Sequence, residues 1–220
     1  MEKRSKILLF VGFGLVLSFA LWTILVKYVG VEGIGPHQSK VGFAALNGWF
    51  HNLTGVNFTL YTITDWLGLV PIGVALAFAV FGLVQWIKRK SLLKVDRNII
   101  GLGLFYLVVM AVYILFELVV INYRPVLIEG YLEASYPSST TLLVMCVIPT
   151  AMLQLHSRIK NRAWRWGIVL FLALFTVFMV GGRVASGVHW ISDIIGGALF
   201  SAGIVLIYYS IFKRDMYALK

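Results

Sequence analysis

The sequence predicts an all-α, polytopic membrane protein in which six transmembrane helices form one bundle. Of its 220 residues, 60% are hydrophobic and only 13% are charged, and the mean hydropathy is +0.89. A soluble domain of this length carries roughly twice that charged fraction. Six apolar runs approach the ~20 residues that a helix needs to cross a bilayer. We therefore expect one membrane domain over residues 1–220.

The six runs set the expected order of helices along the chain. The first run is too long for a signal-peptide core and has no small-residue cleavage site behind it, so we expect it to be retained. The fourth and fifth runs are the shortest. The expected spans are Ile7–Val29, Tyr61–Ile87, Ile99–Asn122, Ser139–Leu155, Trp166–Val180 and Trp190–Phe212.

Basic residues predict the orientation of these spans. Of the 19 Lys and Arg residues, 15 lie at the chain ends or in alternate loops, and such loops face the cytoplasm. Both termini are therefore expected inside. Because topology explains the net charge of +10, we expect no nucleic-acid partner. The 15 residues are Lys3, Arg4, Lys6, Lys88, Arg89, Lys90, Lys94, Arg97, Arg158, Lys160, Arg162, Arg165, Lys213, Arg214 and Lys220.

The first outward connection, about residues 32–60, is long and rich in Gly, Asn and aromatic residues. Between Lys40 and Asn52 its apolar residues recur at roughly helical spacing. This pattern predicts an interfacial helix on the outer leaflet.

Three outward segments hold most of the polar side chains with chemical potential. In Glu117–Pro125, the proline ends the third span and leaves Arg124 at its outer mouth. In Tyr136–Thr141, Pro137 precedes a run of hydroxyls whose helix start offers amides to an anion. The third segment is Gly182–Asp193. The predicted topology brings all three segments to one face of the membrane.

The third segment combines a cation, an imidazole and a carboxylate. Asp193 follows His189 by four residues, so on a helix the two share a face, and the carboxylate holds one ring nitrogen while the other stays free. Arg183 is suited to an oxyanion. In a membrane setting, these groups suggest chemistry on a lipid phosphate. Asp65, near the outer end of the second span, is expected to act as a helix cap or to pair with a nearby polar group.

Each feature also has a plainer interpretation. Arg124 alone resembles an interfacial anchor, a Pro-Ser-Ser sequence is commonly a helix cap, and the pair His189 and Asp193 is compatible with a buried structural contact. The convergence of three segments on one face favours a functional site over three separate structural features.

The three segments resemble the signature of the type 2 phosphatidic acid phosphatase (PAP2) superfamily, which is Lys-x6-Arg-Pro, Pro-Ser-Gly-His and Ser-Arg-x5-His-x3-Asp. The matching residues are Arg124-Pro125, Pro137-Ser138 and Arg183-x5-His189-x3-Asp193.

This resemblance implies that His189 attacks phosphorus and that Asp193 orients it. It also implies that the phosphate oxygens are held by Arg124, Arg183 and the start of the fourth span, which contains Ser138, Ser139 and Thr140. No metal and no other cofactor is implied.

Three positions depart from the signature. Thr140 stands where the family has the histidine that protonates the leaving group, and such proton transfer is worth about 10²–10⁴ in rate. Glu117 replaces the lysine, about 10 Å deeper than Arg124 if both lie on one helix. Such a carboxylate should be paired or protonated, and it is a possible proton donor. Gly182 replaces a serine.

We therefore expect an enzyme that hydrolyses a lipid phosphate or diphosphate at the outer leaflet, in a bacterial plasma membrane, through a phosphohistidine. Without the general acid, we expect diphosphates to be preferred, because phosphate leaves more readily than an alkoxide. Two alternatives remain open: a catalytically impaired protein that binds phosphorylated lipids, and a phosphotransferase with the same site.

Overall fold

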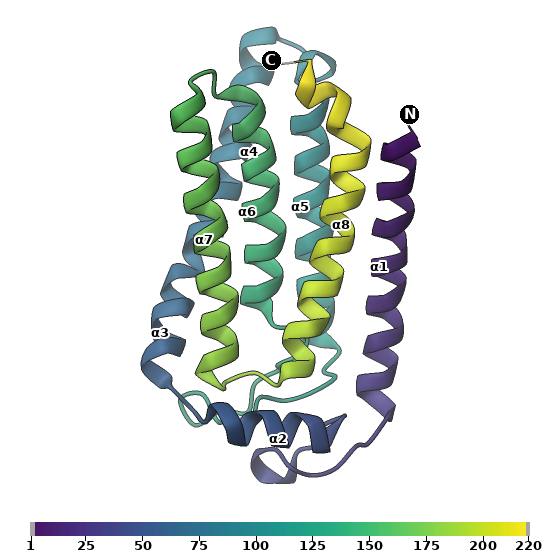
Figure 1. Ribbon diagram of the computed structural model, residues 1–220, viewed down its shortest axis with the longest axis vertical. Helices are drawn as coiled ribbons and strands as arrows, with labels where there is room; N and C mark the ends of the chain where they lie inside the picture. Colours follow the sequence, from purple (N-terminus) through teal and green to yellow (C-terminus); the bar gives the residue numbers. More distant parts are fainter. Residues whose placement is uncertain (1–2, 219–220) are drawn as a thin grey trace.

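The structure is a computed structural model that describes residues 3–218 (Figure 1). Lys220, one of the basic residues expected in the cytoplasm, lies outside the described residues. Within these residues there is no β-strand, only isolated bridges between extended segments. The helices are α1 (Lys3–Tyr28), α2 (Ala44–Thr54), α3 (Phe58–Leu67), α4 (Leu69–Arg89), α5 (Arg97–Leu118), α6 (Ser139–Arg158), α7 (Arg162–Ser186) and α8 (Ile191–Tyr217), with 3-10 turns at Pro36–Gln38 and Leu92–Lys94.

Six helical segments within residues 3–218 are long and apolar enough to cross a membrane. The predicted number of spans is confirmed. The second span is not one continuous helix, because it divides into α3 and α4 at Gly68. Pro71 explains the break, since a proline clashes with the carbonyl four residues before it, here that of Leu67.

The bundle is organised around α6 and α8, which hold much of its buried core. Two glycines bring α1 close to α8. A Cβ atom built on Gly12 would lie 2.9 Å from the carbonyl oxygen of Gly203, and one on Gly203 would lie 2.9 Å from the carbonyl oxygen of Gly12. Larger residues at these two positions would force the helices apart.

The two ends of the bundle differ in character. Both chain ends and the α4–α5 and α6–α7 connections, which carry most of the basic residues, lie at one end (Figure 1). The opposite end holds α2, the connection from α5 to α6 and the turn between α7 and α8 (Figure 1). All three polar segments therefore lie at the end away from the basic loops.

The prediction that the third span extends to Asn122 is wrong, because α5 ends at Leu118. The residues just after α5 form backbone hydrogen bonds with the residues just before α6. The Arg124 amide donates to the Glu133 carbonyl (3.0 Å), and the Ser135 amide donates to the Asn122 carbonyl (2.9 Å). These backbone hydrogen bonds between the two segments replace the i to i−4 hydrogen bonds that a longer helix would make. Arg124 is therefore on an extended segment, and the depth expected for Glu117 relative to it does not apply.

The fifth span is longer than predicted. Helix α7 continues to Ser186, so that Arg183 lies in its last turn. Gly187 then ends the helix with a φ of +64°, and a Cβ there would lie 1.8 Å from the carbonyl oxygen of Gly55. A glycine at this position permits both the turn and the close approach of the α2–α3 connection.

The helix expected between Lys40 and Asn52 is α2, shifted towards the C-terminus. It lies across the end of the bundle that holds the polar segments (Figure 1). Ala44 and Asn47 are buried against the bundle, whereas Trp49 and Leu53 are exposed. Its position on the outer leaflet stays a prediction.

Candidate active site

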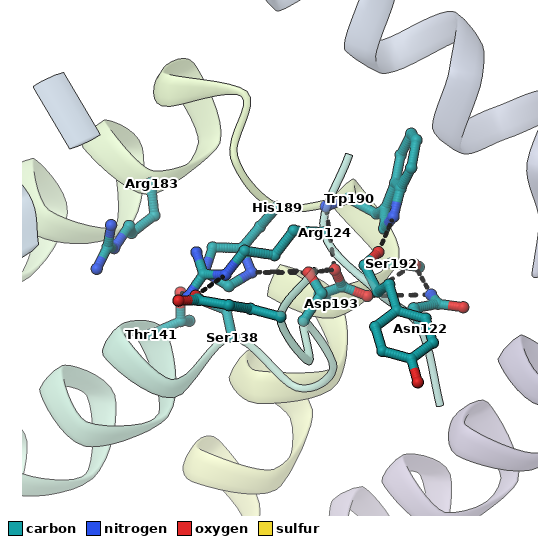
Figure 2. A network of polar contacts seen from close by, with 12 residues as sticks. Asn122, Arg124, Ser138, Thr141, Arg183, His189, Trp190, Ser192 and Asp193 are labelled. Atoms are coloured by element: carbon teal, nitrogen blue, oxygen red, sulfur yellow. Dashed lines mark hydrogen bonds and ion pairs between the residues drawn. The ribbon is translucent and has the colours of Figure 1, made fainter. Parts of the chain in front are cut away.

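His189 lies within a network of polar contacts, two residues before α8 begins (Figure 2). It is buried, and both ring nitrogens have partners. Nη1 of Arg124 lies 3.3 Å from Nε2, and Oγ of Ser135 lies 3.0 Å from Nδ1. Because a guanidinium can only donate, Nε2 is the acceptor and carries a lone pair.

The surroundings of the ring favour its neutral form. Burial lowers the pKa of His189 well below its usual value, and the positive charges of Arg124 and Arg183 lower it further. A neutral imidazole with an unprotonated Nε2 is the form in which that nitrogen acts as a nucleophile.

Asp193 is fully buried and accepts hydrogen bonds from several donors (Figure 2). Oδ2 accepts from the Ser135 hydroxyl (2.5 Å) and the Trp190 amide (3.0 Å). Oδ1 accepts from Nδ2 of Asn122 (3.2 Å) and from the Ser192 hydroxyl (3.3 Å). These bonds satisfy a carboxylate that would otherwise be costly to bury.

The expectation that His189 and Asp193 share a helical face is wrong. Asp193 is the third residue of α8 and accepts the amide of Trp190, the residue that caps the helix, so the helix begins after His189. Nδ1 of His189 is 4.0 Å from Oδ2 of Asp193. Their contact runs through Ser135.

Arg124 reaches His189 from the extended segment after α5. Its Nε lies 3.0 Å from Oε2 of Glu133, whose side chain is 42% exposed. Its guanidinium carbon is also 5.8 Å from the ring centroid of Tyr61. Arg124 is thus held on the side of the imidazole where the Nε2 lone pair points.

Arg183 approaches the site from α7 and stands apart from His189 in Figure 2. Its Nη2 donates to Oδ1 of Asp65 (2.6 Å) and to the Thr140 hydroxyl, and its guanidinium lies 4.9 Å from the centroid of the Tyr61 ring. Of the two roles predicted for Asp65, a helix cap or a partner for a nearby polar group, the structure shows the second. Nε and Nη1 of Arg183 are buried and have no hydrogen-bond partner among residues 3–218, so they remain available to an anion.

The N-terminus of α6 also borders the candidate active site. Ser138 is buried at the cap position, but its hydroxyl accepts from the Thr141 hydroxyl (3.1 Å) and caps no amide. The Ser138 amide donates to the carbonyl of Asp193 (3.2 Å), which ties α6 to α8. The amides of the first helical turn, Ser139 to Thr141, have no partner within a helix and favour an anion.

Glu117 and Ser139 both lie near His189 and Ser135. Both line a small recess that also reaches the imidazole. Glu117 is in the last turn of α5, and its side chain is exposed. Within residues 3–218, no hydrogen bond or ion pair joins its carboxylate to Arg124 or Arg183, whose carboxylate partners are Glu133 and Asp65.

The replacement at Gly182 has a structural explanation. A Cβ there would lie 2.6 Å from Cγ2 of Thr64, so a serine would push α3 away from α7. The glycine permits the close contact of these helices that brings Asp65 to Arg183.

Several residues of the site were not singled out in the sequence. Ser135 and Glu133 come shortly before Pro137, and Asn122 is a polar residue at the end of an apolar run. Their closeness in sequence to the predicted polar segments was only a weak indication that these residues belong to the site. Tyr61, whose ring lies beside both arginines, carried no sequence signal at all.

The PAP2 superfamily model matches residues 72–217, and the chain belongs to this superfamily. It is an integral membrane protein, and the family supports a membrane lipid phosphatase in general. The fold is also similar to the crystal structure of a transmembrane PAP2-type phosphatidylglycerolphosphate phosphatase from Bacillus subtilis. The two share 17% sequence identity with a TM-score of 0.49, over 93% of this chain and 96% of the other. No curated protein matches the chain in sequence.

Proposed function

We propose that the protein hydrolyses a lipid phosphate or diphosphate through a phosphohistidine formed on His189. The observation that carries this proposal is the position of Nε2, which is buried, bears a lone pair and lies 3.3 Å from Nη1 of Arg124. The nucleophile and a cation for the phosphate are therefore side by side. The unpartnered Nε and Nη1 of Arg183 supply further donors.

In the first step the Nε2 lone pair attacks phosphorus and forms an N–P bond. The bond from phosphorus to the leaving oxygen breaks, and that oxygen keeps the electron pair. Arg124, Arg183 and the first amides of α6 hold the remaining phosphate oxygens as negative charge develops. Water then attacks phosphorus, the N–P bond breaks, and inorganic phosphate leaves with His189 restored.

The surroundings of Thr140 support a preference for diphosphates. Its hydroxyl accepts a hydrogen bond from Arg183, and a threonine cannot act as a general acid near neutral pH. An alkoxide leaving group would then depart without a proton. A diphosphate lipid instead releases a lipid phosphate, which needs little protonation.

The distribution of charge supports a site at the outer face. The basic loops lie at the end of the bundle opposite to the turn between α7 and α8, which carries His189 (Figure 1), and such loops stay in the cytoplasm. We place the reaction at the outer leaflet of the plasma membrane, where phosphorylated lipids of that leaflet reach the site.

A second candidate is a protein that binds a lipid phosphate without turning it over. The ion pairs of the two arginines favour it, because Arg124 contacts Glu133 (3.0 Å) and Arg183 contacts Asp65 (2.6 Å). A phosphate must share or displace these carboxylates. A phosphotransferase would use the same first step and differ only in the acceptor.

The test is phosphate release by the purified full chain from matched lipid monophosphates and diphosphates, with His189→Ala as the blank. We expect release that is lost in the blank and faster with diphosphates. Binding of these lipids without any release would support the second candidate and overturn the first. Phosphorylated acceptors in place of free phosphate would identify a transferase, and faster monophosphate hydrolysis would contradict the preference.

A further inference from the structure

The contact between His189 and Asp193 is indirect. Their closest atoms, Nδ1 and Oδ2, are 4.0 Å apart, which is beyond a hydrogen bond. The Ser135 hydroxyl fills the gap, 3.0 Å from Nδ1 and 2.5 Å from Oδ2. All three side chains are buried, so bulk water does not compete for these bonds.

One arrangement of protons satisfies these contacts. Arg124 is always a donor, so Nε2 of His189 accepts, and the neutral ring then carries its hydrogen on Nδ1. That hydrogen is donated to the oxygen of Ser135. The single hydroxyl proton of Ser135 is left for the Asp193 carboxylate, which can only accept. The chain of bonds thus has one direction, from the imidazole to the carboxylate.

The two partners of the ring in this chain of bonds, Ser135 and Asp193, are each held by contacts that do not involve the ring. Asp193 is held by Asn122, Ser192 and the Trp190 amide. Ser135 is held by its own amide, which donates to the carbonyl of Asn122 (2.9 Å). The hydroxyl therefore occupies a defined place to which the imidazole adapts.

We propose that Ser135 is a positioning residue whose hydroxyl connects Asp193 to Nδ1 of His189 and fixes the Nδ1–H tautomer. The Nε2 lone pair is then presented towards Arg124 and the phosphate. The catalytic meaning of this inference rests on the proposed function, but the tautomer does not, because it is a property of the protein without substrate.

The direct test is ¹⁵N NMR of the full chain labelled in its histidine rings, because the two neutral tautomers give different nitrogen shifts. The chain has four histidines, and the His189 signals are those lost in His189→Gln. At pH 7.5 we expect a protonated Nδ1 and an unprotonated Nε2. In Ser135→Ala we expect a mixture of tautomers or the Nε2–H form.

Ser192→Ala is the matched control. Ser192 also donates its hydroxyl to Asp193 (3.3 Å) but makes no hydrogen bond to the ring among the described residues. We expect this variant to keep the Nδ1–H tautomer. A loss of the tautomer in both variants would assign the effect to Asp193 alone and overturn the role of Ser135.

Kinetics give the second measurement. We expect Ser135→Ala to slow formation of the phosphohistidine about 10–100-fold, the range known for removing groups that orient a metal-ligating histidine. KM should change less than the rate, because Ser135 does not touch the phosphate. Thermal unfolding of each variant checks that it is folded.

The outcomes separate the inference from the proposed function. An Nε2–H tautomer in the unsubstituted protein overturns the inference, even if Ser135→Ala does not fold. An unchanged spectrum in Ser135→Ala also overturns it, since the backbone of Ser135, which interacts with the ring as well, would then suffice. If no lipid phosphate is hydrolysed but the tautomer depends on Ser135, the proposed function fails and the inference stands.

Discussion

At the scale of single residues, the site holds a neutral imidazole between one donor and one acceptor. Arg124 lies 3.3 Å from Nε2, and Ser135, which we infer accepts the hydrogen of Nδ1, lies 3.0 Å from that atom. Arg183 extends from α7 to Thr140, and two of its buried donors have no partner within the described residues 3–218. These details support the proposal that Nε2 attacks phosphorus and that the two arginines hold the phosphate.

The buried imidazole predicts how stability depends on pH. Burial lowers the pKa of His189 well below 6.5 in the folded protein, whereas the unfolded chain takes up a proton near pH 6.5. Protonation of His189 in the unfolded chain therefore lowers the stability of the folded protein as the pH falls below 6.5. This loss of folding free energy is on the order of 1 kcal/mol at pH 5.5.

Unfolding in detergent at pH 7.5 and 5.5 measures this effect, with His189→Gln as the reference. The unsubstituted protein should lose more stability on acidification than the variant. An equal loss in both proteins would show that His189 takes up its proton in the folded state.

Thr140 predicts a modest effect on catalysis. Its hydroxyl accepts from Arg183 and supplies no proton at neutral pH. Thr140→Ala should lower kcat for a lipid diphosphate by less than about tenfold, since removing a general acid costs about 10²–10⁴. A loss of a hundredfold or more in steady-state kinetics would assign Thr140 a direct role in proton transfer.

At the scale of elements, the site depends on how closely α3 packs against α7. Helix α3 carries Asp65 and Tyr61, both in contact with Arg183. The break at Gly68 separates this short helix from α4. Packing against α7 therefore determines where α3 and its two site residues lie.

Gly182→Ala tests this packing. The new Cβ would lie 2.6 Å from Cγ2 of Thr64, and such overpacking costs about 1–3 kcal/mol. We expect a lower Tm and weaker binding of phosphate. Gly181→Ala is the matched control, because a Cβ there meets nothing within 4 Å. Thr64→Ala should relieve part of the loss in a double variant, and no relief would place the clash elsewhere.

Sequence patterns predicted the existence of the transmembrane helices better than the residues at which they begin and end. Hydropathy located all six spans, because long apolar runs have one stable form in lipid. The end of α5 at Leu118 was missed, because it depends on pairing between segments around Asn122 and Ser135. Such partners are distant along the chain, and no local pattern indicates them.

The site residues that were predicted carry local sequence signals, whereas those that were missed depend on tertiary contacts. His189, Asp193, Arg124 and Arg183 stood out because charged or polar groups are rare in this chain. Residues such as Tyr61 join the site only through tertiary contacts with the arginines. Local motifs therefore predicted the residues with chemical roles but not the neighbouring residues that hold them in place.

At the scale of the whole molecule, the charge difference between the two ends predicts the orientation in the membrane. Tyr131 is exposed in the α5–α6 connection, and Lys160 is exposed between α6 and α7. The natural cysteine, Cys146, is buried and should not react. We expect Tyr131→Cys to react with a membrane-impermeant thiol reagent in intact cells, and Lys160→Cys to react only after the membrane is opened. The reverse pattern would place the site in the cytoplasm.

The most direct test of the account is to trap the covalent intermediate. The full chain is mixed with a lipid diphosphate labelled in its terminal phosphate and quenched in alkali, which preserves phosphohistidine, and the labelled residue is identified by mass spectrometry. The account predicts acid-labile phosphate on His189 that is absent in His189→Gln. Turnover without this label, or a label on another residue that persists in His189→Gln, would contradict it.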